Sequence, residues 1–210
     1  MKRNFWSSIN NFIKKYHLDA FKDVAIFMII LLFFHFLWRT FVSDIMSVQF
    51  ISNSAALSAR QVFLASQWVL EVLNVKVTTF DELTVGGRLH HNVIYYPENN
   101  GFVYVNRSCS GLKQFYQWVI LMILYPGPWK HKLWYIPVGL VIVHCVNIFR
   151  IVSMTFVTIN IPQHWDFMHD YVLRPFFYVV MFGLWVWWNE KFYHKNRESR
   201  IKSQESRINP

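Results

Sequence analysis

The stretch RSCSGLKQFYQWVILMILY, residues 107–125, decides the fold, because a polar segment runs directly into an apolar helix. The apolar part, about Leu112 to Tyr125, is long enough to enter a membrane. Cys109 is therefore predicted at a membrane–water boundary, on the first turn of that helix, where free backbone N–H groups and the helix dipole favour a thiolate. Gly111 is expected to keep the approach to the sulfur open, and Lys113 adds a positive charge nearby. A small residue at a helix start is common, so this stretch alone assigns no function.

The composition places the chain among polytopic membrane proteins. Of its 210 residues, 54% are hydrophobic and 19% aromatic, which is rare in a soluble domain of this length. The net charge of +9 comes from Lys and Arg beside apolar runs, which suits cytoplasmic flanks and anionic headgroups better than nucleic acid. We therefore expect membrane lipids, and no nucleic acid, among the partners. The two cysteines predict no disulfide framework, and the first apolar run is expected to remain as an anchor.

Hydropathy predicts an all-α integral membrane helical bundle of about four transmembrane helices. The expected spans are 21–42, 112–125, 133–157 and 171–188. The second span ends at a Pro-Gly-Pro sequence, which cannot continue a helix, and a tight basic turn at 130–132 follows. Residues 159–168 are expected to form a short loop, and the three Trp within 185–188 an interfacial aromatic belt.

Residues 43–108 are predicted to form an extracytoplasmic insertion with two parts. The first, 53–75, is apolar, but polar residues recur on one helical face: Asn53, Arg60, Gln67, Glu71 and Asn74. Such groups facing lipid would be costly, so we expect an amphipathic helix on the outer surface or packed against the bundle. The second, 76–108, has short β-rich runs separated by turn signals such as Gly86-Gly87, which predict a small sheet outside the membrane.

The distribution of positive charge predicts the orientation. The N-terminal segment has five Lys and Arg, the turn at 130–132 two and the tail from Lys191 six, against four in 43–108. Because cytoplasmic flanks carry the excess of Lys and Arg, both termini and the turn are expected inside, and the sheet and Cys109 outside. The predicted domains are a cytoplasmic amphipathic segment (1–20), the transmembrane domain (21–192) and a basic cytoplasmic tail (193–210).

In this orientation three polar groups gather near the outer side of the membrane. Cys109 opens the second span, Arg150 lies on the third span roughly 10 Å below its outer end, and His169 enters at the mouth of the fourth. Arg150 is the strongest indication of function, because a guanidinium at the centre of a span costs about 2.5–3.5 kcal/mol even on insertion scales. The alternative is a structural arginine that bonds carbonyls or reaches the interface. Asn147, one turn earlier, either orients the guanidinium or bridges helices.

These groups suit acyl transfer. A thiolate attacks a carbonyl and forms an acyl-enzyme, an imidazole moves protons to the leaving amine and from the incoming nucleophile, and a guanidinium stabilises the thiolate or the oxyanion. The other histidines on this side, His90, His91 and His164, show no HExxH or Cys-pair spacing, so no metal and no cofactor are expected. His144 and Cys145 are expected to pack within the bundle.

The ordered motifs resemble the exosortase/archaeosortase family of membrane transpeptidases. The resemblance covers about 108–188 and lies in Ser108-Cys109-Ser110-Gly111 at a helix start, Asn147-Ile148-Phe149-Arg150 in a later span, and His169 opening the last span. It implies a catalytic Cys109, Arg150 and His169, supported by Asn147, Ser110, Gly111 and Arg174. Some archaeal relatives use arginine at the third position, so Arg174 competes with His169. The chain is shorter than the larger family members, and 76–108 matches no part of the family that we can place.

The resemblance also implies a substrate and a location. The family cleaves a C-terminal sorting signal, made of a short motif, a transmembrane helix and a basic cluster, and joins the exported protein to an envelope acceptor. The expected partners are therefore such exported proteins, membrane lipids and a co-encoded accessory protein. The expected location is the cytoplasmic (inner) membrane, crossed several times, with the active site on the extracytoplasmic side.

Two other functions stay open. One is a membrane cysteine peptidase that cuts on the cytoplasmic side, and the other is a non-enzymatic envelope scaffold or assembly factor that uses the outer sheet. A lipid phosphatase is less well supported, because Arg174-Pro175 has no downstream Ser-Gly-His sequence.

Overall fold

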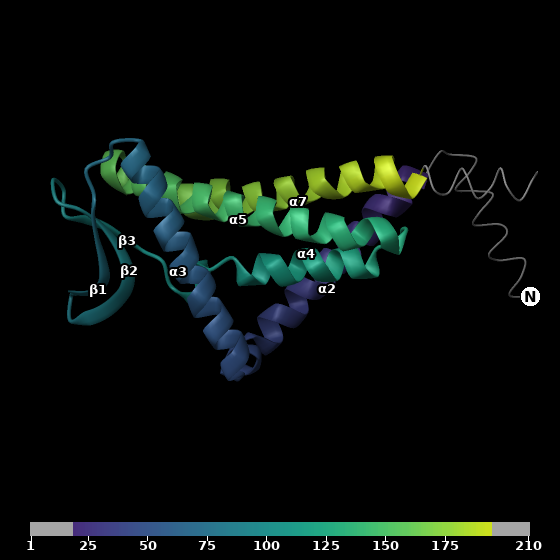
Figure 1. Ribbon diagram of the computed structural model, residues 1–210, viewed down its shortest axis with the longest axis horizontal. Helices are drawn as coiled ribbons and strands as arrows, with labels where there is room; N and C mark the ends of the chain where they lie inside the picture. Colours follow the sequence, from purple (N-terminus) through teal and green to yellow (C-terminus); the bar gives the residue numbers. More distant parts are fainter. Residues whose placement is uncertain (1–18, 195–210) are drawn as a thin grey trace, which may run out of the picture.

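The structure is a computed structural model that describes residues 19–194, so nearly all of the predicted segments 1–20 and 193–210 lies outside the described residues. Its long helices are α2 (Asp19–Ser47), α3 (Gln49–Val72), α4 (Leu112–Leu124), α5 (Trp129–Asn160) and α7 (Arg174–Trp188). α4, α5 and α7 run alongside one another, while α2 begins near the end of α7 and diverges until it meets α3 at an elbow (Figure 1). α3 then returns across the far end of the bundle, next to the sheet.

The helical membrane bundle predicted from hydropathy is confirmed. Among the described residues, three helical stretches are long and apolar enough to cross a membrane: Phe21–Phe41, Trp129–Asn160 and Pro162–Tyr193. α4 lies in the same bundle but has only 13 residues, about 20 Å of helix, which is less than the roughly 30 Å hydrocarbon core of a bilayer. The start of α4 is therefore recessed relative to the longer helices beside it.

The loop predicted at 159–168 is wrong. α5 continues to Asn160, and helical structure resumes at Pro162 as the 3-10 turn η2 (Pro162–His164), α6 (Trp165–Phe167) and the π-helix η3 (Met168–Leu173). Only Ile161 interrupts the helix, with φ −141° and ψ 57°. Pro162 occupies the first position of the new helix, where proline is favoured because its N–H is not needed. The polar residues that indicated a loop thus lie on a helix above α7.

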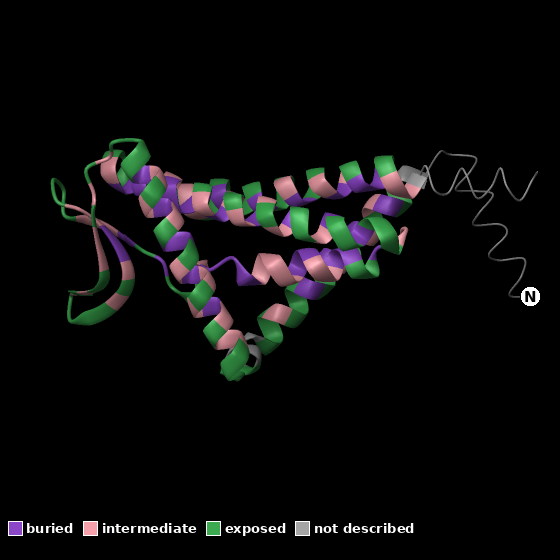
Figure 2. Ribbon diagram, viewed as in Figure 1, coloured by how far each residue is buried: buried purple, intermediate pink, exposed green. Residues whose placement is uncertain are grey.

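α3 is the amphipathic helix expected in this region, and it is packed against the bundle. Its buried face is made of small and apolar residues: Ala55, Ala59, Val62, Phe63, Ser66 and Leu70. This face packs with residues of the sheet and α5, including Ile94, Val105 and Ile151. A second stripe is apolar and exposed: Phe50, Leu57, Leu64, Trp68 and Val72. α3 therefore has one face for the protein and another suited to the interface of a membrane (Figure 2).

The predicted small sheet is a three-stranded antiparallel meander, ordered β1 (Thr78–Val85), β2 (Arg88–Tyr96) and β3 (Gly101–Tyr104). Gly86 and Gly87 join β1 to β2 with φ of 57° and 76°, the left-handed values that a two-residue type I′ hairpin requires. In the second turn, the Asn99 carboxamide donates to the carbonyl oxygens of Thr158 and Ile159 at 3.0 and 3.1 Å. The sheet is thereby tied to the end of α5.

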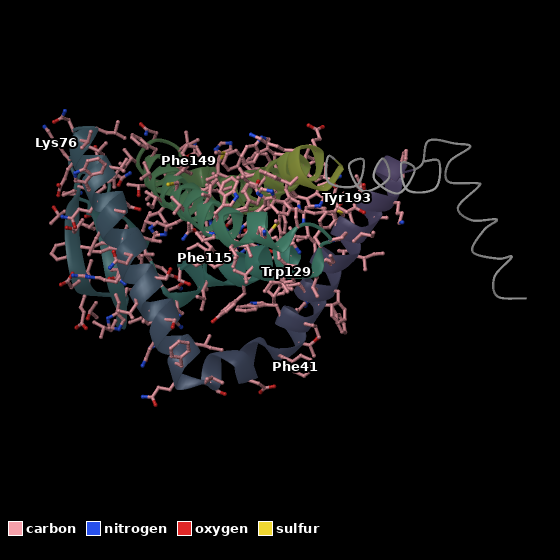
Figure 3. The ribbon with its side chains drawn as sticks, turned by 45° about the vertical axis from the view of Figure 1, so that its right-hand side comes forward. Phe41, Lys76, Phe115, Trp129, Phe149 and Tyr193 are labelled. Atoms are coloured by element: carbon pink, nitrogen blue, oxygen red, sulfur yellow. The ribbon has the colours of Figure 1, made fainter. Side chains whose placement is uncertain are left out.

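The opposite end of the bundle holds an aromatic core, which we call the aromatic end. Its residues include Trp118, Tyr125, Tyr135, Trp185 and Trp188, each at most 2% exposed. The predicted aromatic belt is therefore wrong for Trp185 and Trp188, which lie on the inward face of α7, whereas Trp187 is 42% exposed. Side chains fill the space between the helices, with Tyr193 and Lys76 at opposite ends of the molecule (Figure 3).

The basic turn predicted at 130–132 is the first turn of α5. Lys132 is 2% exposed, and its ammonium donates to the carbonyl oxygens of Tyr125 and Ile123 at 2.6 and 3.4 Å. It lies over the Trp129 ring, 4.5 Å from the centroid. These carbonyls have no partner inside α4 because they belong to its end, so Lys132 caps the short helix.

Candidate active site

Cys109 lies before α4 rather than on its first turn, which corrects the sequence-based prediction. It is the last residue of the 3-10 helix η1 (Arg107–Cys109), and α4 begins only at Leu112. The Cys109 N–H donates to the backbone and side-chain oxygens of Asn106 at 3.0 and 3.1 Å. Between the two helices Gly111 has φ 77°, a left-handed conformation that an α-helix cannot contain. The chain therefore turns after the cysteine.

Gly111 and Asn147 fit together behind Cys109. A Cβ at Gly111 would lie 2.9 Å from Nδ2 of Asn147, so only glycine lets the carboxamide approach. That nitrogen donates to the carbonyl oxygen of Cys109 at 2.9 Å. Gly111 thus allows a close approach of α5, and its predicted role in keeping the approach to the sulfur open stays a prediction. Of the two roles left open for Asn147, the structure shows the bridge between helices, and Asn147 is fully buried.

Ser110 is held from α3. The Ser58 hydroxyl donates to the carbonyl oxygen of Ser110 at 2.8 Å, and the hydroxyl of Ser110 accepts the N–H of Leu112 at 3.2 Å. Ser110 is 1% exposed. The two residues after Cys109 are consequently fixed by α3 and α5 together.

Arg150 and His169 are in direct contact. Nη2 of Arg150 lies 2.8 Å from Nε2 of His169, although the two residues come from different helices. Arg150 is ten residues before the end of α5 at Asn160, so about 15 Å from that end rather than the predicted 10 Å. It is 8% exposed, and in the described chain its buried Nε has no hydrogen-bond partner. The guanidinium is thus inside the protein and is only partly satisfied.

The contact fixes the tautomer of His169. A guanidinium has only N–H donors, so Nε2 of the imidazole must accept, and the single proton of the neutral ring is on Nδ1. Nδ1 lies 2.5 Å from Oδ1 of Asp170, which accepts that proton's hydrogen bond. The same carboxylate oxygen is 3.2 Å from Nη1 of Arg174. Arg174 is therefore linked to His169 through Asp170, and which of the two takes the third catalytic position stays a prediction.

Cys109, Arg150 and His169 line one cavity of about 370 Å³. Its remaining wall comes from β3, η1, α5 and α6: Phe102, Val103, Tyr104, Asn106, Ser108, Ile151, Met154 and Trp165. The indole of Trp165 stacks on the His169 ring with centroids 4.8 Å apart and planes at 11°. The predicted trio is thus brought together beside a largely apolar pocket that has room for a few residues of a peptide.

Other predicted residues lie elsewhere. Lys113 lines a different cavity, and its ammonium is 3.3 Å from Nδ1 of His35 on α2. His144 packs near Phe115, with ring centroids 6.2 Å apart, whereas Cys145 is exposed on the outside of α5. The prediction that both pack in the bundle therefore holds only for His144.

Three residues of the site were missed by the sequence-based analysis: Asn106, Trp165 and Asp170. The role of Asp170 could have been predicted, because a carboxylate next to an expected catalytic histidine commonly accepts from the second ring nitrogen of that histidine. Trp165 is four residues before His169, which is one helical turn, but the predicted loop concealed that relation. In the described residues, no group of three His, Cys, Asp or Glu side chains could hold a metal ion, and the absence of a metal stays a prediction.

The chain matches a model of a known protein family. A family model described as transmembrane exosortase (Exosortase_EpsH) matches residues 20–186, which include Cys109, Arg150 and His169. No curated protein and no solved structure matches the chain.

Proposed function

The chain belongs to the transmembrane exosortase family, and from that premise we propose that it is a membrane-embedded cysteine transpeptidase. Its substrates would be exported proteins that carry a C-terminal sorting signal, which the enzyme cleaves before it transfers the protein to an envelope acceptor. The observation that supports the proposal most is the shared cavity of Cys109, Arg150 and His169. A thiol, a guanidinium and an imidazole at one small cavity are the groups that acyl transfer needs.

In the first step, the thiolate of Cys109 attacks the carbonyl carbon of the scissile peptide bond. A C–S bond forms and negative charge moves to the carbonyl oxygen, which gives a tetrahedral intermediate. Arg150 is the donor for that oxyanion, because its guanidinium lines the same cavity as Cys109 and, among the described residues, is only partly hydrogen-bonded. In a cavity with little water, such a charged donor is worth more than it would be in bulk solvent.

His169 moves the protons. It takes the thiol proton on Nε2, which forms the thiolate, and gives a proton to the leaving nitrogen as the C–N bond breaks. Because Nε2 now accepts from Arg150 at 2.8 Å, substrate must draw the guanidinium toward the carbonyl oxygen and so release the imidazole. Asp170 holds the ring by Nδ1 in the meantime. The resting contact is therefore a closed state that substrate opens.

In the second step, a nucleophile of the acceptor attacks the thioester. His169 takes its proton, the C–S bond breaks and the thiolate of Cys109 is restored, so that no oxidant or cofactor is consumed. Water in place of the acceptor would give hydrolysis. The Trp165 ring on one face of the imidazole and the apolar wall of Ile151 and Met154 limit the access of water to this site.

In the proposed orientation, this site lies on the extracytoplasmic side of the cytoplasmic membrane. The start of α2, the first turn of α5 and the end of α7 lie at one end of the bundle, and the sheet lies at the other (Figure 1). The basic residues of these three segments thus share one end, as the excess of positive charge on the cytoplasmic side requires. An impermeant thiol reagent should label Cys109 in intact cells, and labelling only after lysis would favour a peptidase that works on the cytoplasmic side.

The experiment that tests the function compares exported proteins by mass spectrometry in strains with the unaltered gene, Cys109→Ala and Cys145→Ala. We expect uncleaved C-terminal signals to accumulate with Cys109→Ala only, because Cys145 lies outside the site. Normal processing with Cys109→Ala would overturn the proposal. Together with loss of function when 76–108 is deleted, it would indicate an envelope scaffold instead.

A further inference from the structure

We propose that the free edge of β3 binds the substrate as an added strand and delivers its scissile bond to Cys109. The ligand is an extended polypeptide segment, recognised mainly through its backbone. This inference rests on the proposed function, because it names how the same site holds its peptide.

The first observation is that β3 has an unpaired edge. β3 pairs with β2 on one side only and is the last strand of the sheet. The N–H of Val105, just after the strand, donates to the carbonyl oxygen of Asn92 at 3.0 Å. Because residues of an antiparallel pair alternate between bonded and non-bonded positions, Val103 also faces β2, and the backbone groups of Phe102 and Tyr104 face away from it. In the described chain these groups make no backbone hydrogen bond to another element.

The second observation is where this edge leads. Phe102, Val103 and Tyr104 line the cavity that also contains Cys109 and His169. Cys109 is five residues after Tyr104 in the chain, so the strand runs toward the thiol. The other wall of the cavity belongs to α5 and α6, which offer side chains but no strand. A peptide along the four residues of β3 would cover about 13 Å and end beside the sulfur.

The third observation is that the side chains of β3 are already engaged. Val103 is 8% exposed and belongs to the buried face of the strand. Tyr104 and Phe102 lie on the other face beside His90, with ring centroids 4.6 and 5.8 Å from its ring. What the strand still offers is its backbone, and strand addition uses main-chain hydrogen bonds for affinity and alternate side-chain pockets for specificity. Alternate substrate side chains would point into the apolar wall around Met154.

The test uses the full-length protein in lipid nanodiscs and a defined probe, acetyl-Ala-Ala-Ala-chloromethyl ketone, which alkylates thiolates. Each of its three amide nitrogens is methylated in turn, and the rate of Cys109 labelling is followed by mass spectrometry, with Cys145 as the internal reference. Loss of one paired N–H should slow labelling by about five- to tenfold. We expect alternation, with a slow reaction when a nitrogen that faces β3 is methylated and a change below twofold at its neighbours.

Two variants of Tyr104 test the contribution of the β3 backbone. Tyr104→Pro removes an outward N–H that no other strand uses, a change that edge strands tolerate, whereas Tyr104→Ala removes only the ring. Labelling by the peptide probe should fall about five- to tenfold for Tyr104→Pro relative to Tyr104→Ala, and labelling by iodoacetamide should be equal in both. If the proline variant does not fold, the methylation scan on the unaltered protein decides alone.

The outcomes separate this inference from the function on which it rests. A uniform methylation profile, or labelling of Cys109 no faster than that of Cys145, overturns strand addition and leaves the processing experiment unaffected. Normal processing in the Cys109→Ala strain overturns the transpeptidase, whatever the probe shows. An alternating profile with equal loss in the proline variant supports the β3 edge as the substrate platform.

Discussion

The two ends of the bundle are packed in different ways. At the aromatic end, rings fill the space between α2, α4, α5 and α7, and even Lys132 is buried with its ammonium bonded. At the site end, the core residues are mostly small or aliphatic, and a cavity of about 370 Å³ is lined by Cys109, Arg150 and His169. In the described residues both ends hold buried polar atoms without hydrogen-bond partners, namely the indole nitrogens of Trp185 and Trp188 at the aromatic end and atoms of Arg150 and Asn147 at the site end. The difference between the ends is therefore one of packing: large rings fill the aromatic end, whereas the site end keeps a cavity beside the candidate site.

The largest effect that we expect is a loss of substrate processing, caused by a substitution at the site end. Arg150→Lys should lower processing by about 10²–10³-fold, the usual cost of one lost oxyanion donor, because an ammonium cannot reproduce the planar fork that reaches both His169 and the oxyanion. Thermal stability should change little. Processing is measured by quantitative mass spectrometry of the cleaved product. Arg39→Lys on the exposed side of α2 is the control, and near-normal turnover by Arg150→Lys would contradict the role of the fork.

The next effect is at the aromatic end and concerns stability. A Cβ at Gly139 would lie 2.2 Å from the buried Trp118 ring, so Gly139→Ala should lower the free energy of unfolding by about 1–3 kcal/mol through overpacking. Gly183→Ala on α7 is the matched control, because a Cβ there meets nothing within 4 Å. Thermal denaturation in detergent measures both. Equal melting temperatures for the two variants would mean that the aromatic end is not tightly packed.

A smaller effect should show whether Asp170 positions His169 or only fills space in the site. Asp170→Asn keeps the size of the side chain but weakens its bond to Nδ1 of His169, so we expect about a tenfold loss of turnover. Because the imidazole keeps less control of its tautomer, the pH dependence of turnover should also shift, which a purely structural role would not cause. A pH–rate profile on the purified protein measures both. An unchanged profile with a lower melting temperature would assign Asp170 to packing alone.

The smallest effect is expected on the exposed surface of the sheet, away from the candidate site. The Arg60 guanidinium donates to the Asp81 carboxylate and holds the pKa of that carboxyl below its usual value. A carboxyl with a lowered folded-state pKa contributes stability above its unfolded pKa of about 3.9, and the contribution is lost as the pH falls through the lower folded value. The difference in melting temperature between the unaltered protein and Asp81→Asn should therefore be small at pH 7 and disappear as the pH falls through the lower folded pKa of Asp81. A difference that grows toward low pH would contradict the assignment.

What could be predicted from the sequence follows from the cost of placing each residue in a membrane. Arg150 could be identified because a guanidinium in an apolar span is costly and normally faces a cavity or a partner. His169 could be identified because it lies at the mouth of the next span. The prediction of an interfacial belt was wrong for Trp185 and Trp188, because hydropathy does not distinguish a ring that faces lipid from one that faces a neighbouring helix. That distinction depends on the rotation of α7, which only the packing fixes.

The missed parts of the site depend on contacts between distant residues. That Gly111 must be glycine follows from the position of Asn147, which is 36 residues later, and no local pattern reveals it. The prediction of a loop at 159–168 was wrong because polar residues were interpreted as irregular structure, although a helix can also carry them. Trp165 was missed as a result, whereas Asp170 lies just outside that range beside His169.

The π-helical stretch from Met168 to Leu173 has a consequence for how this helix tolerates change. A π-helix holds more residues per turn than an α-helix, so this stretch sets a rotational offset between the residues above it and those of α7. Deleting a single residue there would turn the upper part by about 100° relative to the lower. Trp185 would keep its place in the core while Trp165 swung away from the chemistry. Length changes in this stretch would therefore alter the position of Trp165 relative to α7, and we expect them to abolish the proposed activity without unfolding the protein.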